Sequence, residues 1–295
     1  MKNITLRLKG GLGNQLFQVR QALDLCNKIQ AELALDVSWY DLASNKFNSH
    51  GKRIYSLKNF EEFTAIPIVG SRAQFFDVYM DRIVNRTPKR IRNKFGVYVE
   101  DEVSDLVESS QEKFKIQGYW ISGAPLDVEI NRLTLVKEHI NSEFNRALRL
   151  ILNPSLVSVH VRLGDFQEFP EIYNVCDTFF YLKQIKVMCQ TLELQPSQVT
   201  VCLFSDGDIT ELHNVLIEHQ YNVLEFSKAF QLSDLQTFMI LSRAQNIICS
   251  NSTFSWWAAR LNSESPKRVI FPKYMDKKRT SESLQLNQDN WRIAE

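Results

Sequence analysis

The chain has 295 residues, of which 44% are hydrophobic, and its 35 basic side chains nearly balance 34 acidic ones to give a net charge of +1. This length and composition predict two ordinary domains or one large one, with enough apolar residues for a core in each. The balanced charge gives no reason to expect a nucleic acid partner, so an anionic ligand has to be bound by charges that are placed locally.

Cysteine usage and the amino terminus both indicate a reducing cytoplasm. The five cysteines are odd in number and widely spaced, at positions 26, 176, 189, 202 and 249. No CxxC pair or Cys/His cluster has the spacing of zinc ligands, so we expect reduced, buried thiols. The first residues alternate like a strand and lack the continuous apolar block of a signal peptide or a membrane anchor.

The first part of the chain predicts a βαβ unit followed by an irregular insertion. Apolar spacing indicates a strand over residues 4–9, an amphipathic helix over 16–29 and a second strand over 31–36. Residues 38–117 are expected to be irregular apart from a basic helix around 77–94. The charges of that helix are more typical of a solvated face than of contact with an anionic membrane.

The best domain boundary follows residue 152. A helix is expected over residues 128–151, and Asn153-Pro154 then breaks the helical pattern. We therefore expect an N-terminal domain over 1–152 and a C-terminal domain over 153–295, with the last residues packing back on the N-terminal domain.

The second half alternates strands and helices. Beyond a strand over 156–162, the pattern predicts strands over 199–204, 222–226, 246–250 and 269–271, and helices over 209–219, over 233–242 and from residue 253. Such alternation predicts the α/β class, with a parallel sheet covered on both faces. Ligands of these sheets lie beyond the carboxyl ends of the strands, where the strand order reverses.

A cationic side chain stands at the end of the strand over 156–162. Side chains alternate along a strand, so the sequence His-Val-Arg-Leu-Gly-Asp at residues 160–165 turns His160 and Arg162 to one face and the valines to the other. An arginine there donates two parallel hydrogen bonds to phosphate oxygens, which favours a phosphorylated ligand. The alternative is a structural ion pair between Arg162 and Asp165, with His160 as a satisfied interior side chain.

A glycine-rich turn, Gly-Gly-Leu-Gly-Asn-Gln at residues 10–15, joins the first strand to the first helix. Gly11 and Gly13 allow the backbone to approach a ligand, and helix amino termini favour anions. The polar pair Asn14 and Gln15 favours contact with a substrate or a sugar. A simple tight turn is the alternative.

The same turn also raises the alternative of an NAD-dependent dehydrogenase. Asp36, at the end of the second strand, would be the acidic residue of such a dinucleotide site. Leu16 stands where the third glycine of the GxGxxG fingerprint belongs, and the turn has no Gly-Lys-Ser/Thr ending of a phosphate-binding loop. The sequence therefore argues against both of these nucleotide-binding motifs.

A third turn follows the strand over 246–250. Residues 251–259 read Asn-Ser-Thr-Phe-Ser-Trp-Trp-Ala-Ala, and either Asn251 or Ser252 has the residue type of a helix cap. The backbone amides after the cap favour a phosphate. An ordinary cap, with the aromatic residues as helix core, is the alternative.

A fourth turn, Phe-Ser-Asp-Gly-Asp at residues 204–208, carries two carboxylates. Asp206 and Asp208 have the composition of a clamp that holds Mg²⁺ or Mn²⁺ on a nucleotide diphosphate. A loop with a helix-capping aspartate is the commoner meaning of this pattern. A carboxylate here is also able to accept hydrogen bonds from a purine or a ribose.

Taken in order, these motifs resemble the signatures of a known family. Residues 10–18, 160–166, 204–206 and 251–259 resemble the successive signatures of the α-1,2-fucosyltransferases of glycosyltransferase family 11. The similarity extends to Gly118-Tyr119-Trp120 and to the tail between Pro272 and Trp291, so it covers almost the whole chain.

The chain also departs from the pattern of that family. Val19-Arg20 replaces an aromatic and a small residue, Leu163 a frequent second arginine, Phe166 a tyrosine and Gly207 a common second aspartate, and Ser122-Gly123 differs from the usual glutamine-containing run. Loss of the second arginine removes one phosphate contact. The region around Ser122-Gly123 is expected to shape the acceptor pocket.

The resemblance implies a GT-B fold, in which two Rossmann-like domains with parallel sheets face a cleft, the N-terminal domain on the acceptor side. It implies GDP-fucose as the donor and inverting transfer of L-fucose to the 2-hydroxyl of a terminal β-galactoside, without a metal or a cofactor. The acceptor is expected to be a lipid-linked precursor of a surface polysaccharide such as O-antigen. The enzyme is then expected at the inner face of the cytoplasmic membrane, with at most peripheral membrane contact.

The resemblance also assigns roles to residues. Arg162 is expected to stabilise the negative charge that builds on the departing diphosphate, because no divalent cation does so. Asn14 and Asp165 complete the expected catalytic set. Asp165 is included for its residue type, either as the group that accepts the proton of the acceptor hydroxyl or as a partner that orients Arg162. Residues expected to bind the nucleotide sugar are His160, Arg162, Gly11, Gly13, Asp206, Ser252, Thr253 and Phe254. A metal-dependent GT-A-type transferase that uses Asp206 and Asp208, and a nucleotide-sugar-binding protein without catalysis, are the alternatives.

Overall fold

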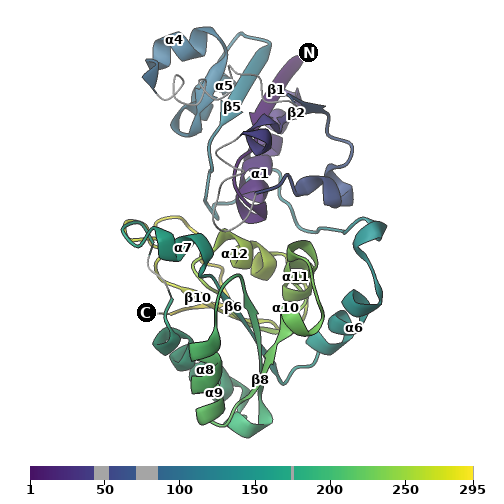
Figure 1. Cartoon of the computed structure of the whole chain (residues 1–295). Helices are drawn as coiled ribbons and strands as arrows, with labels where there is room; N and C mark the ends of the chain where they lie inside the picture. Colours follow the sequence, from purple (N-terminus) through teal and green to yellow (C-terminus); the bar gives the residue numbers. More distant parts are fainter. Residues whose placement is uncertain (43–52, 71–85, 174–175, 295) are drawn as a thin grey trace. The chain divides into compact units, whose positions relative to one another are not determined.

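The computed structural model describes residues 1–42, 53–70, 86–173 and 176–294, and the chain divides into two compact units (Figure 1). The first unit is Met1–Thr134 and the second is Leu135–Glu295. The expected boundary at residue 152 is therefore too late. The reason is that helix α6 (Ser142–Ile151) packs against helix α11 (Asp234–Leu241), which lies in the second unit.

The first unit is built on a parallel sheet. Its five strands, in the order β3-β2-β1-β5-β4, are β1 (Lys2–Arg7), β2 (Ala31–Asp36), β3 (Ile68–Val69), β4 (Val97–Val99) and β5 (Lys113–Gln117). Strands β1 and β2 and the helix between them, α1 (Leu12–Ile29), confirm the predicted βαβ unit. The expectation of an irregular segment over 38–117 is wrong, because this segment supplies β3, β4 and β5.

Short helices connect these strands. They are α4 (Lys89–Lys94), α5 (Val103–Val107) and the 3-10 helices η1 (Ser38–Asp41), η2 (Leu57–Asn59), η3 (Glu61–Phe63) and η4 (Glu100–Glu102). The amino-terminal part of the predicted basic helix, up to residue 85, lies outside the described residues. Two of the basic side chains of α4 bind acidic neighbours, since Lys89 pairs with Asp105 and Arg92 with Glu102.

The glycine-rich turn before α1 is held by two buried glutamine side chains. Gln15 donates to the carbonyls of Gly10 (3.1 Å) and Ile54 (2.8 Å) and accepts from the Ser56 amide (2.9 Å). One helical turn later, Gln18 forms hydrogen bonds with both the amide and the carbonyl of Lys9. The interpretation of Gln15 as a substrate contact is therefore wrong, because its polar atoms bind the protein.

The second unit is built on a larger parallel sheet. Its six strands, in the order β8-β7-β6-β9-β10-β11, are β6 (Leu156–Val161), β7 (Thr200–Ser205), β8 (Asn222–Glu225), β9 (Asn246–Ile248), β10 (Arg268–Pro272) and β11 (Trp291–Ala294). The chain starts in the middle, runs to one edge, returns to the middle and runs to the other edge, which is the order of a Rossmann fold. The strand order reverses between β6 and β9.

Helices cover both faces of this sheet, as predicted (Figure 1). Besides α6 and α11 they are α7 (Gly164–Glu168), α8 (Thr178–Leu192), α9 (Thr210–Glu218), α10 (Phe226–Ala229), α12 (Thr253–Arg260) and the 3-10 helices η5 (Lys137–His139) and η6 (Pro196–Gln198). The valines of β6 share a buried cluster with apolar side chains of α8 and α9. Each such valine or leucine stabilises the fold by about 1.5–3 kcal/mol when it leaves water.

One further expectation about this part of the chain is wrong. The helix predicted over 128–151 begins only at Ser142, where the side chain of Asn141 caps it by accepting from the Phe144 amide (2.8 Å). The final residues form β11, which pairs with β10 and whose Trp291 ring contacts Trp256 and Phe271, and their packing on the N-terminal domain stays a prediction.

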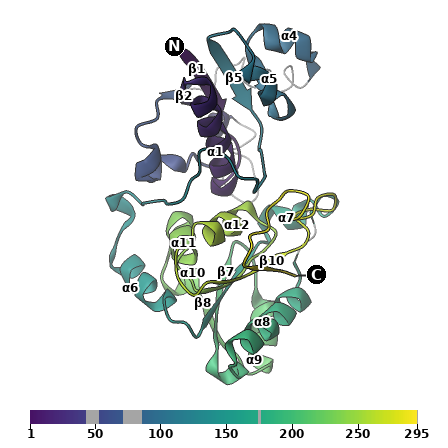
Figure 2. The same ribbon diagram turned by 180° about the vertical axis from the view of Figure 1, so that it is seen from behind.

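Seen from behind, the termini of the chain lie in different units (Figure 2). All five cysteines are free, and four of them are buried, which agrees with the expectation of reduced thiols. Burial raises the pKa of the Cys26 and Cys202 thiols to about 12. No helix among the described residues is both long and apolar enough to cross a membrane.

Replacing Gln15 with leucine tests the role of this side chain in the glycine-rich turn. The substitution leaves the buried amide of Ser56 without its partner and removes one donor each from the carbonyls of Gly10 and Ile54, so we expect the free energy of unfolding to fall by about 1–3 kcal/mol. Urea denaturation measures this change. The control is Gln190→Leu, at an exposed position of α8. Equal stabilities of Gln15→Leu and Gln190→Leu would contradict a structural role.

Candidate active site

Polar residues of the second unit meet at the point where the strand order reverses. Strands β6 and β9 are neighbours there, and β7 lies on the other side of β6. Arg162 follows β6, Asp206 follows β7, and Ser252 stands shortly after β9. Ligands of open α/β sheets bind at this place. The structure thus brings together residues that the sequence analysis selected from separate motifs.

The ionic partner of Arg162 is Asp206. The Arg162 Nη1 group donates to Asp206 Oδ2, and the Leu163 amide donates to Asp206 Oδ1 at 2.9 Å. The ring of Phe166 lies 5.5 Å from the guanidinium carbon. The side chain of Asp165 lies outside the described residues, so the alternative of an ion pair between Arg162 and Asp165 stays a prediction. Asp206 therefore holds the guanidinium, which is 16% exposed, at the end of β6.

Two glycines allow the close approach of β6 and β7 at this end. A Cβ atom on Gly164 would lie 2.6 Å from Asp206 Oδ2, and one on Gly207 would lie 2.8 Å from the Cβ of Leu163. Leu163 is buried against Gly207. Leu163 and Gly207 are the positions at which the family resemblance leads us to expect an arginine and an aspartate. These two positions are therefore in contact, and the contact is apolar.

His160 is an interior side chain that joins β6 to the segment after β9. Its Nδ1 atom forms a 2.8 Å hydrogen bond with Ser250 Oγ, and its ring stacks on Phe254 with a centroid distance of 5.2 Å. Burial lowers the pKa of His160 to about 4, so the ring is neutral at pH 7. These contacts favour the interior interpretation, and direct contact with a nucleotide stays a prediction.

The turn after β9 caps helix α12. Ser252 is the N-cap, because its Oγ accepts from the Phe254 amide at 3.2 Å. Asn251 instead donates to the Met275 carbonyl at 3.1 Å and thereby fixes the loop after β10. The first turn of α12 has no acidic side chain, which leaves the positive end of the helix dipole uncompensated. Phosphate contacts by Thr253 and Phe254 stay predictions.

The two carboxylates of the Asp-Gly-Asp turn have different partners. Asp208 Oδ1 accepts from both the amide (2.9 Å) and the hydroxyl (2.6 Å) of Thr210, and these hydrogen bonds lower the pKa of Asp208. Asp208 thus binds the first residue of α9, whereas Asp206 binds Arg162. Within the described ranges, no group of three or more His, Cys, Asp or Glu side chains is arranged to hold a metal ion.

The first unit has its own candidate residues, at the ends of β1 and β5. Gly10 adopts a φ of +76°, which favours glycine, and Gly11 is the N-cap of α1. The Tyr40 hydroxyl donates to the Gly10 carbonyl at 3.1 Å, and Arg53 Nη1 lies within 3.5 Å of where a Cβ on Gly11 would be. Nothing in the sequence around Arg53 indicated this position.

Gly13 and Asn14 follow within α1. Gly13 is buried, and Asn14 is half-buried, with its side chain packed close to Gly10. The glycine-rich turn is thus a tight turn held by the protein, which leaves Asn14 as the polar side chain of the motif that a ligand can reach. The roles of Gly11, Gly13 and Asn14 toward a substrate stay predictions.

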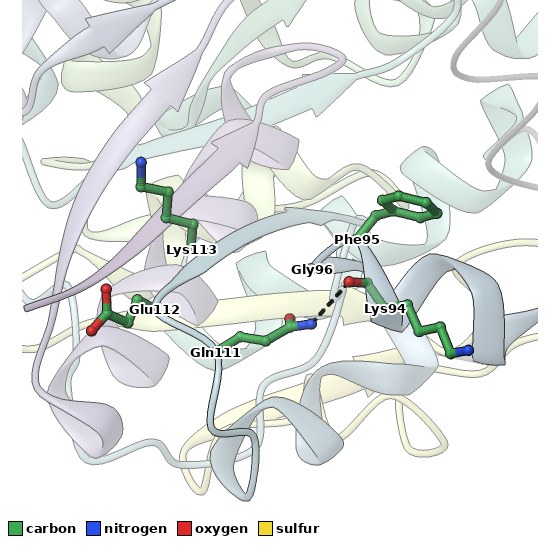
Figure 3. Close-up of a pocket in the computed structure, with 6 residues that line it drawn as sticks. All are labelled: Lys94, Phe95, Gly96, Gln111, Glu112 and Lys113. Atoms are coloured by element: carbon green, nitrogen blue, oxygen red, sulfur yellow. Dashed lines mark hydrogen bonds between the residues drawn. The ribbon is translucent and has the colours of Figure 1, made fainter.

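A recess of about 400 Å³ lies on the first unit, away from these positions (Figure 3). Its lining residues are Lys94, Phe95, Gly96, Gln111, Glu112 and Lys113. They precede β4 and β5 or begin them, so the recess lies at the amino ends of these strands. Figure 3 shows the side chains of Lys113 and Lys94 pointing away from each other. The recess therefore lacks both the location and the convergent polar groups of an active site.

Comparison with known proteins identifies the family. The sequence profile described as glycosyl transferase family 11 matches residues 3–295. The chain belongs to glycosyl transferase family 11. It is 26% identical over 298 residues to the O-antigen biosynthesis glycosyltransferase WbnK of Escherichia coli, covering 90% of this chain and 92% of that protein. It is 24% identical over 280 residues to an alpha-1,2-colitosyltransferase of Escherichia coli, covering 92% of each chain.

Two solved structures share the fold. The crystal structure of fucosyltransferase NodZ from Bradyrhizobium superposes with a TM-score of 0.51 at 15% identity and covers 87% of this chain and 91% of NodZ. POFUT1 in complex with GDP superposes with a TM-score of 0.50 at 13% identity, covering 92% of this chain and 98% of that one. With two units that are each built on a parallel sheet, these likenesses confirm the predicted GT-B class. That the sheets face a cleft stays a prediction.

The buried neutral state of His160 predicts a pH dependence of stability. Because the folded pKa of about 4 lies below the ordinary value of 6.5, the unfolded chain takes up a proton first as the pH falls. The stabilisation is thus complete above pH 6.5 and is lost as the pH falls from 6.5 to 4. We expect the wild type to lose roughly 1–3 kcal/mol more than His160→Gln between about pH 7 and about pH 4.5. Urea unfolding at both pH values measures the difference, and equal losses would contradict the assignment.

Proposed function

We propose that this protein transfers L-fucose from GDP-fucose to the 2-hydroxyl of a terminal β-galactoside, with inversion at the fucose anomeric carbon and without a metal. The observation that carries the proposal is the guanidinium of Arg162, which Asp206 and the Leu163 amide hold at the strand reversal of the second unit. Membership of family 11 and the likeness to WbnK support the reaction class.

Arg162 supplies the charge that the leaving group needs. As the bond between fucose and GDP breaks, negative charge builds on the β-phosphate, and a fixed cation stabilises it without reorganisation. Asp206 fixes the position of the guanidinium, while Phe166 lies over its face. The amino terminus of α12, with no acidic residue in its first turn, supplies a second source of positive potential at the same sheet edge.

The acceptor hydroxyl must attack from the opposite face of the fucose and lose its proton as it does so. In the proposal, Asp165 is the candidate that accepts this proton, because it is a carboxylate three residues after Arg162. Asn14 contributes a polar side chain from the first unit, where the half-buried amide stands at the start of α1. In the proposal, Gly11 and Gly13 allow the backbone of that turn to approach the substrate closely.

Metal independence is supported by what the two aspartates already bind. Both oxygens of Asp206 accept hydrogen bonds, from Arg162 and from the Leu163 amide, and Asp208 caps Thr210. A GT-A-type clamp would have to place a cation on the carboxylate of Asp206 beside the Arg162 guanidinium, and like charges so close together repel each other. The alternative of a metal-dependent transferase therefore carries an electrostatic cost that the proposed mechanism does not.

A second donor is a specific alternative. One of the relatives is an alpha-1,2-colitosyltransferase, at nearly the same identity as WbnK. In the proposed mechanism Arg162 binds the diphosphate, so a colitose donor linked to the same diphosphate is compatible with it, and the choice of donor is left to the experiment below.

We place the reaction in the synthesis of a surface polysaccharide such as O-antigen, on a lipid-linked precursor at the inner face of the cytoplasmic membrane. The name of the relative WbnK supports the pathway. Exposed apolar and basic side chains of the α4 region, among them Arg90, Ile91 and Phe95, support a peripheral contact with anionic lipid.

One experiment tests the reaction, its donor and its metal dependence together. The purified protein is incubated with GDP-fucose or a GDP-linked colitose and a panel of β-galactosides, with and without excess EDTA, and the new linkage is located. We expect fucose on the 2-hydroxyl of galactose and equal rates in EDTA. Activity lost in EDTA and restored by Mn²⁺ would favour the GT-A-type alternative, and binding of the donor without release of GDP would favour a non-catalytic protein.

Arg162→Ala tests the residue that carries the proposal. Removing a donor that stabilises transition-state charge lowers kcat by roughly 10²–10³-fold, and we expect this loss with an unchanged circular dichroism spectrum. Arg292→Ala, at an exposed arginine of β11 in the same sheet, is the control and should keep its rate. A near-normal kcat in a folded Arg162→Ala variant would contradict the role of Arg162.

A further inference from the structure

The segment after β5 is an irregular loop at the strand reversal of the first sheet. Residues 118–129, which we name the β5 exit loop, contain no helix or strand and are mostly half-buried. The loop leaves the carboxyl end of β5, which pairs with β1 in the middle of the sheet. Ligand-binding loops of open α/β sheets occupy this location.

One end of the exit loop is fixed by Glu100. Its carboxylate accepts hydrogen bonds from the amides of Tyr119 (2.8 Å) and Trp120 (2.7 Å), and the indole of Trp120 donates to the Glu100 carbonyl at 3.2 Å. A Cβ on Gly118 would lie 2.7 Å from that of Glu100. Trp120 has a φ of +44°, a conformation that costs free energy in a residue other than glycine.

The other end of the exit loop is fixed by Arg20, which projects from α1. Its guanidinium donates to both carboxylate oxygens of Glu129 (2.7 and 2.5 Å) and to the carbonyls of Ser122 (3.0 Å) and Ala124 (2.5 Å). Arg20 is 5% exposed. A buried charge of this kind is tolerated only because its hydrogen bonds are satisfied.

One helical turn further along α1, Asp24 accepts from the Asp127 amide at 2.8 Å. Glu129 in turn accepts from the Leu126 amide at 3.0 Å. The backbone groups of the exit loop thus form hydrogen bonds with charged side chains, where those of a strand or a helix would pair with other backbone groups. Arg20 and Ser122 are two positions at which the chain departs from the family pattern. They contact each other through the hydrogen bond from the Arg20 guanidinium to the Ser122 carbonyl.

Between these two anchors the loop presents an aromatic side chain. Tyr119 is 41% exposed, although its backbone is held on the carboxylate of Glu100. It lies near enough to Tyr40 to affect the ionisation of that phenol, and Tyr40 binds the Gly10 carbonyl. The exposed ring therefore belongs to the same end of the sheet as the glycine-rich turn.

We propose that Tyr119 binds the sugar ring of the acceptor and that Arg20 is a positioning residue that presents it by holding the exit loop. Aromatic rings combine an apolar face with, in tyrosine, a polar hydroxyl, which suits a sugar that has both CH and OH groups. A loop fixed before the ligand arrives loses little conformational entropy on binding, which explains the buried charges and the strained Trp120. The inference rests on the proposed transferase function, and it assigns acceptor selection to this chain's own loop.

Tyr119→Ala tests the contact at an exposed position where the fold is not at risk. We expect the KM for the galactoside acceptor to rise by about tenfold or more, since each tenfold corresponds to the loss of one good contact. Binding of GDP-fucose, measured by calorimetry, and its slow hydrolysis without acceptor should be unchanged. Phe179→Ala, at a 73% exposed ring of α8 in the second unit, is the control. An unchanged acceptor KM in Tyr119→Ala would overturn the proposal.

Arg20→Lys tests the positioning role, because lysine cannot reproduce the two parallel bonds to Glu129. We expect a higher acceptor KM and weaker discrimination among galactosides, with GDP-fucose affinity unchanged. A purely structural role would lower the melting temperature without separating acceptor from donor, and that result would overturn the proposal. If Arg20→Lys does not fold, Glu129→Gln gives the same comparison at a partly exposed side chain.

The failure of this inference is distinguishable from failure of the proposed function. A wild-type protein that neither binds GDP-fucose nor transfers fucose would overturn both. A wild type that transfers fucose while Tyr119→Ala keeps its acceptor KM would overturn the inference alone.

Discussion

The ion pair between Arg162 and Asp206 is the interaction on which the account of the second unit depends. It joins the ends of two neighbouring strands, and the residues are separated by 44 positions in the sequence. The sheet order brings them together, and the glycines at 164 and 207 make room for the contact. An arginine held in this way is a fixed cation at the place where α/β sheets bind diphosphates. In the proposed mechanism, this arginine supplies the charge that a metal ion would otherwise provide.

In the first unit, buried polar side chains also fix irregular segments of the chain. Helix α1 carries polar side chains on its buried face, and each of them binds a loop rather than another helix: Gln15 and Gln18 hold the glycine-rich turn, and Arg20 and Asp24 hold the exit loop. Buried polar groups are costly unless all of their hydrogen bonds are made. The helix thereby fixes the irregular segments at both middle strands of its sheet.

The sequence predicted the parts of the fold that local patterns determine. The strand over 31–36 is found at its predicted bounds, and the cap at Ser252 is confirmed, because strand alternation and N-cap chemistry depend on neighbours in the chain. The strands β3, β4 and β5 were missed because they are short, with two to five residues each. The helix expected over 128–151 was too long, since part of that segment is the exit loop.

Long-range contacts explain the remaining differences at the site. Asp206, the ionic partner of Arg162 that the structure shows, comes from the neighbouring strand and lies 44 positions away, and no pattern in the sequence paired the two. In the same way, Arg20 was noted only as a departure from the family, and its partner Glu129 lies 109 positions away. Motifs located the site, but the pairing within it follows from strand order and helix placement.

The most direct test of the central claim is a crystal structure of the protein with GDP. The account predicts that a β-phosphate oxygen lies at the distance of a charge-assisted hydrogen bond, roughly 2.7–2.9 Å, from the Arg162 guanidinium, with no cation between the phosphate and Asp206. A nucleotide bound away from Arg162, or bridged to Asp206 and Asp208 by Mn²⁺, would contradict the account.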